Sequence, residues 1–189
     1  MHVLWDFDGT LFDTYPSYTT TLHRALNGRV FKEELFFALK VSFSHAIEKF
    51  NITEQELSLY KKLEEEISLE DMPPFKGVRE ILALNKRNVI MTHKPRREVE
   101  IILDYWELTR FFEELVCGDD GYPRKPDPAS YLYLHEKFQL DLAIGDREID
   151  ILPAKTLGIK TCLFQNTTSG ADYYLNDYAH FTDVVPFKP

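Results

Sequence analysis

Asp6 and Asp8 lie two positions apart, directly after the apolar run Val3, Leu4 and Trp5. A carboxylate is costly to hold beside a hydrophobic strand, and two neighbouring carboxylates repel each other. A divalent cation would offset this repulsion, and Mg²⁺ prefers oxygen ligands. The pair therefore indicates metal-assisted chemistry at the end of a buried strand.

Other polar side chains also follow apolar runs. In an open parallel sheet, ligands bind at the carboxyl ends of the strands, so these side chains should meet Asp6 and Asp8 at one edge. The side chains are Thr92, His93, Lys125, Asp146 and Asp150.

Such a set of residues suits phosphoryl transfer. Three aspartates supply oxygen ligands for Mg²⁺, and a lysine with a threonine hydroxyl can bind an anion beside the metal. One aspartate could attack phosphorus and form an aspartyl-phosphate. A second could protonate the leaving group and later activate water.

The pattern of elements predicts where these residues stand. Short apolar runs predict buried parallel strands at 2–5, 88–92, 114–118, 142–146 and 160–164. Helical patterns at 77–86, 95–106, 126–138 and 148–158 lie between them. This alternation predicts an α/β fold, a Rossmann-like parallel sheet with helices on both faces. Pro153 is expected in the first turn of its helix, where no backbone N–H is needed.

Residues 15–72 interrupt the alternation and contain no strand-like run. Thr53 and Glu56 have the spacing of a capping box, and apolar residues then recur at helical spacing. We therefore predict a core formed by 1–14 and 73–189, and an inserted all-helical domain at 15–72.

The chain resembles the haloacid dehalogenase (HAD) superfamily in four places. These are D-F-D-G-T at 6–10, Thr92, K-P at 125–126 and G-D-x-x-x-D at 145–150. Their order and strand positions agree with the family, and the likeness extends over nearly the whole chain. It is similar to the phosphoglycolate phosphatase-like and beta-phosphoglucomutase-like members, which implies that 15–72 is a helical cap over a small substrate.

The resemblance implies a role for each matching residue. Asp6 is expected to be the nucleophile and a metal ligand, and Asp8 the acid/base that also contacts the metal through its carbonyl. Asp146 is expected to bind Mg²⁺ directly, with Asp150 in support. Thr92 and Lys125 join Asp6 and Asp8 as the catalytic residues. The residues expected to bind phosphate are Gly9, Thr10, Thr92, His93 and Lys125.

Asp8 also favours one reaction within the family. Dehalogenases resemble this scaffold but lack an aspartate at this position, because a halide leaves without a proton. The sequence therefore predicts a Mg²⁺-dependent phosphatase that acts on a small phosphorylated metabolite through an aspartyl-phosphate on Asp6. A phosphomutase acting on a sugar phosphate and a non-catalytic protein that binds a phosphorylated ligand are the alternatives.

His93 departs from the family pattern, since many relatives have asparagine after the motif threonine. An imidazole can donate a hydrogen bond to substrate or phosphate, and it titrates near neutral pH. A contact with substrate and a structural hydrogen bond are both open for this side chain.

Composition limits the partners. The formal charge of −9 argues against binding to nucleic acid or to anionic membranes, both of which need clustered cations. No apolar run approaches the ~20 residues that span a bilayer, and the N-terminus has no signal-peptide pattern. We expect a cytoplasmic protein, a monomer or weak dimer, in which Cys117 and Cys162 are buried, reduced thiols.

Overall fold

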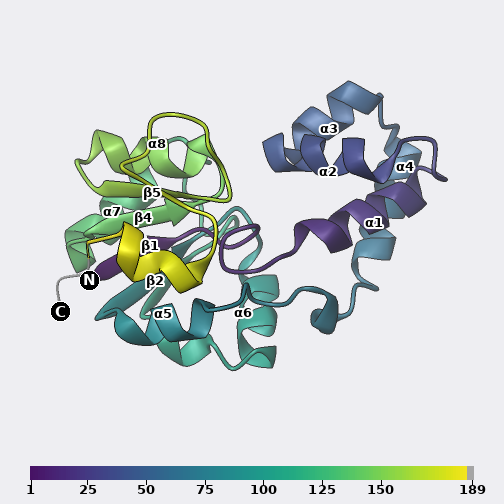
Figure 1. Cartoon of the computed structure of the whole chain (residues 1–189). Helices are drawn as coiled ribbons and strands as arrows, with labels where there is room; N and C mark the ends of the chain where they lie inside the picture. Colours follow the sequence, from purple (N-terminus) through teal and green to yellow (C-terminus); the bar gives the residue numbers. More distant parts are fainter. Residues whose placement is uncertain (187–189) are drawn as a thin grey trace. The chain divides into compact units, whose positions relative to one another are not determined.

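The structure is a computed structural model that describes residues 1–186 (Figure 1). One parallel sheet forms the centre of the larger of its two compact units. Its strand order is β3-β2-β1-β4-β5-β6. The order reverses between β1 and β4, because β2 and β3 extend the sheet on one side of β1 and β4 to β6 on the other. The strands are β1 (His2–Trp5), β2 (Arg87–Met91), β3 (Glu114–Val116), β4 (Leu142–Gly145), β5 (Lys160–Phe164) and β6 (Tyr173–Leu175).

The predicted parallel α/β sheet is confirmed, and five of its strands lie where the apolar runs predicted them. Strand β6 was not predicted, because it has only three residues and one of them, Tyr174, is exposed. It pairs with β5, with Leu163 opposite Tyr174. The periodicity of a sequence does not show which segments pair in this way.

Helices cover both faces of this sheet. The helices α5 (Val78–Leu84) and α6 (Arg96–Tyr105) lie on one side, and α7 (Ala129–Phe138) and α8 (Glu148–Thr156) lie on the other (Figure 1). Shorter helical turns are η1 (Leu69–Asp71), η2 (Thr109–Phe111), η3 (Tyr178–His180) and α9 (Phe181–Val184).

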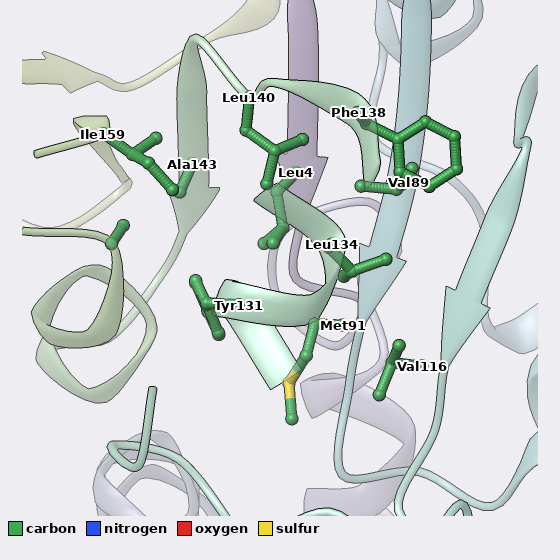
Figure 2. Close-up of a cluster of buried hydrophobic side chains, with 11 residues drawn as sticks. Leu4, Val89, Met91, Val116, Tyr131, Leu134, Phe138, Leu140, Ala143 and Ile159 are labelled. Carbon is green, nitrogen blue, oxygen red and sulfur yellow. The ribbon is translucent and has the colours of Figure 1, made fainter. Parts of the chain in front are cut away.

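A cluster of apolar side chains joins the sheet to α7 and α8. Figure 2 shows Leu4 of β1 and Val89 of β2 near Leu134 of α7, and all three are fully buried or nearly so. Each such side chain contributes roughly 1.5–3 kcal/mol when it leaves water. The cluster therefore fixes the strands whose ends carry the polar residues.

Residues Asp13–Pro73 form a second compact unit, separate in its contacts from the unit of Met1–Phe12 and Pro74–Pro189. This inserted helical unit begins two residues before the predicted domain 15–72 and ends one residue after it. It has its own buried cluster, in which Leu22, Leu35 and Ala46 are fully buried. Its helices are α1 (Tyr15–Ala25), α2 (Lys32–Val41), α3 (Phe43–Phe50) and α4 (Glu54–Glu64).

The predicted capping box at the start of α4 is confirmed. The Glu56 N–H donates to Thr53 Oγ1 at 3.2 Å, and the Thr53 N–H donates to Glu56 Oε2 at 2.8 Å. Two N–H groups that the helix leaves without partners are thus satisfied reciprocally.

The predicted place of Pro153 in a first helical turn is wrong. Helix α8 begins at Glu148, so Pro153 is its sixth residue and lies in the second turn. The helix begins at Glu148 because the Asp150 carboxylate accepts the Arg147 N–H at 3.0 Å and fixes the N-terminus there.

Two expectations about single features can be compared with the structure. Cys117 and Cys162 are buried and form no disulfide, as predicted. Among residues 1–186, no helix has the length and apolar character that a membrane crossing requires.

Asn88 is a buried polar side chain that connects three elements of the core. The Trp5 indole N–H donates to Asn88 Oδ1 at 2.9 Å, which joins β1 to β2. Asn88 Nδ2 donates to the carbonyls of Leu82 and Phe111, at 2.9 Å and 3.3 Å, which brings in α5 and η2.

We predict that Asn88→Ala lowers the free energy of unfolding by about 2–4 kcal/mol, because it leaves several buried polar groups unsatisfied. Urea denaturation followed by circular dichroism measures the loss. The control is Asn85→Ala, which removes one donor to Asn88 Oδ1 (3.0 Å) at a half-buried position and should cost less. Equal losses in the two variants would contradict the connecting role of Asn88.

Candidate active site

The candidate active site lies at the carboxyl ends of β1 and β4, where the strand order reverses (Figure 1). Asp6 follows the last residue of β1, and its N–H donates to Ile144 O at 2.9 Å. Asp146 follows the last residue of β4. Because Trp5 is in register with Ile144, the sheet itself places the two carboxylates at the same edge.

Three buried carboxylates meet at this edge. Asp6, Asp146 and Asp150 each offer an oxygen, and these oxygens lie within 4.8 Å of one another. All three residues are at most 2% exposed. So close a group of acids in a dry environment can be fully ionised only with cations nearby.

Lys125 supplies one of these cations. Its Nζ lies 2.6 Å from Asp6 Oδ1 and 2.7 Å from Asp150 Oδ1, and its side chain is fully buried. Burial alone would lower the pKa of Lys125, but the carboxylates of Asp150 and Asp6 outweigh burial and raise it. The ammonium therefore stays charged and bridges the two acids.

The two bridged acids differ in their pKa. Burial and the neighbouring Asp150 raise the pKa of Asp6 to about 6, against the opposing effect of Lys125. Burial would also raise the pKa of Asp150, but Lys125 and Arg147 lower it below its ordinary value. Of these two acids, Asp6 is thus the one whose ionised form a further cation would stabilise more.

The charges and donor atoms of the cluster fit a divalent cation. Arg147 Nε lies 3.7 Å from Asp146 Oδ1 and 3.8 Å from Asp150 Oδ2. Three carboxylates thus face the two cations Lys125 and Arg147, which leaves one negative charge. Buried carboxylate oxygens are hard ligands of the kind that Mg²⁺ prefers, so these acids could hold that ion.

The G-D-x-x-x-D segment brings Asp150 into the cluster through a close approach of the chain. A Cβ added to Gly145 would lie 2.2 Å from the Cβ of Asp150, so a residue with a side chain does not fit there. The Tyr131 hydroxyl of α7 donates to Asp150 O at 2.8 Å and fixes the same turn. Glycine is thus required at position 145 for Asp150 to reach the cluster.

The loop after β1 folds tightly on itself. Gly9 has a φ of 78°, in the left-handed region that favours glycine, and its N–H donates to Phe12 O at 2.8 Å. The Thr10 hydroxyl lies 3.4 Å from Asp6 Oδ2, and the Thr10 N–H has a long 3.4 Å contact with Phe7 O. The Gly9 amide is therefore held within the loop, and its contact with phosphate stays a prediction.

Asp8 is not one of the three clustered carboxylates. Its Oδ1 lies 3.5 Å from Lys94 Nζ, and its side chain is 23% exposed. Lys94 is buried and also lies 3.5 Å from Glu98 Oε2. We assigned Lys94 no role from the sequence, although its place two residues after Thr92 at a strand end was an available signal.

Thr92 and His93 follow β2 and connect it to β3 and to the loop that carries Lys125. Thr92 Oγ1 accepts the Lys94 N–H at 3.2 Å, and the Thr92 N–H donates to Val116 O at 2.9 Å. His93 Nε2 accepts the Lys125 N–H at 2.8 Å. His93 therefore makes a structural hydrogen bond, one of the two roles left open by the sequence.

The structure brings Asp6, Asp146, Asp150 and Lys125 into direct proximity, and it places Asp8 with Lys94 beside them. Sequence reasoning missed two further contacts. Arg147 faces the acids, and the Asn166 side chain donates to Asp146 O at 2.8 Å. Neither residue carries a spacing signal, because each contact depends on how a loop folds.

Residues 3–164 match the family of haloacid dehalogenase-like hydrolases. The match covers most of the chain, and the chain belongs to this family.

Individual relatives agree with this membership. The chain is 30% identical over 182 residues to a phosphoglycolate phosphatase of Pseudomonas putida KT2440, with 84% of this chain and 66% of that relative covered. It thus spans just under two thirds of the length of that relative.

Solved structures are also similar. The crystal structure of a hydrolase from Streptococcus pneumoniae TIGR4 is 35% identical, with a TM-score of 0.69 over 87% of this chain and 92% of that one. The crystal structure of a predicted phosphoglycolate phosphatase from Haemophilus somnus 129pt has a TM-score of 0.75 at 22% identity over 96% of each chain, a likeness of fold.

We predict that Mg²⁺ raises the midpoint of thermal unfolding, because an ion that binds only the folded cluster stabilises it by mass action. The gain is about 2.7 kcal/mol at a concentration of 100 times Kd. Differential scanning fluorimetry with Mg²⁺ or EDTA measures the shift. Asp146→Asn should abolish it, and the control Asp141→Asn, at the opposite end of β4, should retain it. A wild-type midpoint that Mg²⁺ leaves unchanged would contradict the metal site.

We also predict that His93 makes stability depend on pH. Burial, with the positive charges of Lys125, Arg124 and Arg147 outweighing Asp150, lowers the pKa of His93 from 6.5 to about 4. Between these values the unfolded chain binds a proton that the folded chain does not, so stability falls as pH drops through this range. His93→Gln should lose less stability than wild type in urea denaturation between neutral pH and about pH 4. Parallel losses would show that this histidine is not the cause.

Proposed function

We propose that the protein is a Mg²⁺-dependent phosphatase that hydrolyses a small phosphorylated metabolite through an aspartyl-phosphate on Asp6. The observation that carries the proposal is the buried Lys125 ammonium, held 2.6 Å from Asp6 beside two further buried carboxylates. Membership of a hydrolase family and the likeness to a phosphoglycolate phosphatase support a phosphate ester as substrate.

Asp6 is the proposed nucleophile. Lys125 holds its Oδ1, so we assign the attack on phosphorus to Oδ2, which faces the Thr10 hydroxyl at 3.4 Å. The attack forms a bond from this oxygen to phosphorus and breaks the bond from phosphorus to the ester oxygen. The ammonium offsets negative charge as the phosphoryl group approaches the acids.

Asp8 is the proposed general acid and base. It gives a proton to the departing ester oxygen, then takes one from the water that attacks the aspartyl-phosphate and releases inorganic phosphate. Its partly exposed carboxylate suits this exchange, since it must meet both the leaving group and water. Lys94 lies beside it, and we assign that cation to holding the Asp8 side chain.

The remaining assignments follow the same proposal. Mg²⁺ would be held by Asp6, Asp146 and the Asp8 carbonyl, with Asp150 in support, and it would supply a positive charge for the transferring phosphoryl group. Gly9, Thr10, Thr92 and Lys125 are the proposed phosphate-binding residues.

We propose that the inserted helical unit, Asp13–Pro73, acts as the cap that selects a small substrate. Its own buried cluster supports this, because a unit that packs around its own core can move as one body. A cytoplasmic location and a monomeric or weakly dimeric state stay predictions from the sequence.

We predict that the wild-type protein releases inorganic phosphate from at least one compound in a panel, with Mg²⁺ and not with EDTA. The panel contains phosphoglycolate, sugar phosphates, nucleoside monophosphates and pyridoxal phosphate. Asp6→Asn should lower the rate by at least about 100-fold, because an amide oxygen is a poor nucleophile. Asp141→Asn, which changes an acid far from the site, should keep the wild-type rate.

The result separates the alternatives. An Asp6→Asn variant that keeps a tenth of the rate would refute the nucleophile. Conversion of a sugar phosphate to an isomer without net phosphate release would show a phosphomutase. A folded protein that binds Mg²⁺ and a phosphorylated compound without turnover would show a binding protein.

A further inference from the structure

We propose that His93 is a positioning residue for Lys125, through the hydrogen bond that its imidazole accepts from the Lys125 backbone. This inference rests on the proposed function, and it assigns His93 a contact with the loop that carries Lys125 instead of a contact with the substrate.

The loop from Cys117 to Pro128 carries Lys125, and both of its ends are joined to the residues that follow β2. At its beginning, the Gly118 N–H donates to Lys94 O at 2.9 Å. Near its end, the Lys125 N–H donates to His93 Nε2 at 2.8 Å. Because a lysine stem is long and flexible, a fixed backbone limits where its ammonium can go.

The His93 backbone is itself held in place. A Cβ added to Gly118 would lie 2.1 Å from His93 O, so the start of the loop passes directly against the His93 peptide. The imidazole therefore extends from an anchored backbone to the Lys125 backbone. From this backbone the Lys125 side chain extends to the acids, where its ammonium lies 2.6 Å from Asp6 and 2.7 Å from Asp150.

The hydrogen bond requires one form of the imidazole. A backbone N–H is the donor, so Nε2 must carry a lone pair and the ring proton must be on Nδ1. A protonated ring has no acceptor and would lose the bond. Burial and the surrounding cations Lys125, Arg124 and Arg147, which outweigh Asp150, lower the pKa of His93 to about 4 and so keep the acceptor at neutral pH.

The length of the side chain gives the proposal a selective test. In glutamine, Oε1 stands as many bonds from the backbone as Nε2 does in histidine, so His93→Gln can accept the same N–H. In asparagine the oxygen is one bond closer to the backbone, so His93→Asn should fall short. An alanine removes the acceptor and leaves the Lys125 N–H without it.

His135 is a matched control. Its Nδ1 accepts the Leu140 N–H at 3.0 Å, which is the same type of bond between a ring nitrogen and a backbone amide. It belongs to the last turn of α7, next to the connection that leads into the amino end of β4. His135→Ala therefore tests the loss of such a bond away from the loop that carries Lys125.

The first measurement is steady-state hydrolysis of p-nitrophenyl phosphate with Mg²⁺. We expect His93→Ala and His93→Asn to lower kcat on the order of tenfold to a hundredfold with KM changed less than about twofold, because a small displacement of a catalytic group is costly. His93→Gln and His135→Ala should keep kcat within about threefold. A raised KM at unchanged kcat would instead show a substrate contact and overturn the proposal.

The second measurement needs no substrate. Hydrogen exchange of the Lys125 amide, followed by NMR, should be at least about tenfold faster in His93→Ala and His93→Asn than in wild type, and unchanged in His93→Gln. Equal exchange in wild type and His93→Ala would overturn the hydrogen bond. If the wild type hydrolyses no phosphate ester, the proposed function fails, and this exchange still decides whether His93 positions Lys125.

Discussion

The buried contact of one ammonium with two carboxylates is the interaction on which the rest of the site depends. Lys125 Nζ lies within 2.7 Å of both Asp6 and Asp150, with no exposed surface on its side chain. Breaking such a pair leaves an uncompensated buried charge, which is strongly unfavourable. The close turn at Gly145, the capped first turn of α8 and the loop that carries Lys125 all have the effect of keeping these three groups in contact.

The sheet and the loops contribute differently to this arrangement. Register alone brings Asp6 and Asp146 to one edge, because β1 and β4 are neighbours and end together. Lys125 and Asp150 come from a loop and a helix start, and each needs specific hydrogen bonds to reach the cluster. The strands thus fix Asp6 and Asp146, whereas Asp150 depends on the start of α8 and the cation depends on side chains such as His93.

Most of the fold could be predicted because short stretches of sequence indicate their own secondary structure. Apolar runs showed five strands, and the spacing of Thr53 and Glu56 showed where α4 begins. Strand β6 and the place of Pro153 were not predicted correctly, since one depends on pairing and the other on a cap made by Asp150. The candidate site residues followed from the rule that strand ends share an edge. The contacts of Lys94 with Asp8 and of His93 with Lys125 did not follow, because they join residues whose distance is set by loop folding.

Tyr178 has a consequence for how the protein is made. Its hydroxyl donates to Thr10 O at 2.8 Å, and its ring stacks on Phe164, so a residue of η3 supports the loop that follows β1. The central strand is also the first to be synthesised, and one of its neighbours, β4, begins at Leu142. A nascent chain on the ribosome therefore holds Asp6 and Asp8 without their final surroundings until Tyr178 has emerged. The loop after β1 thus gains this contact only after Tyr178 has been made, and the edge of β1 that pairs with β4 stays unpaired until β4 has been made.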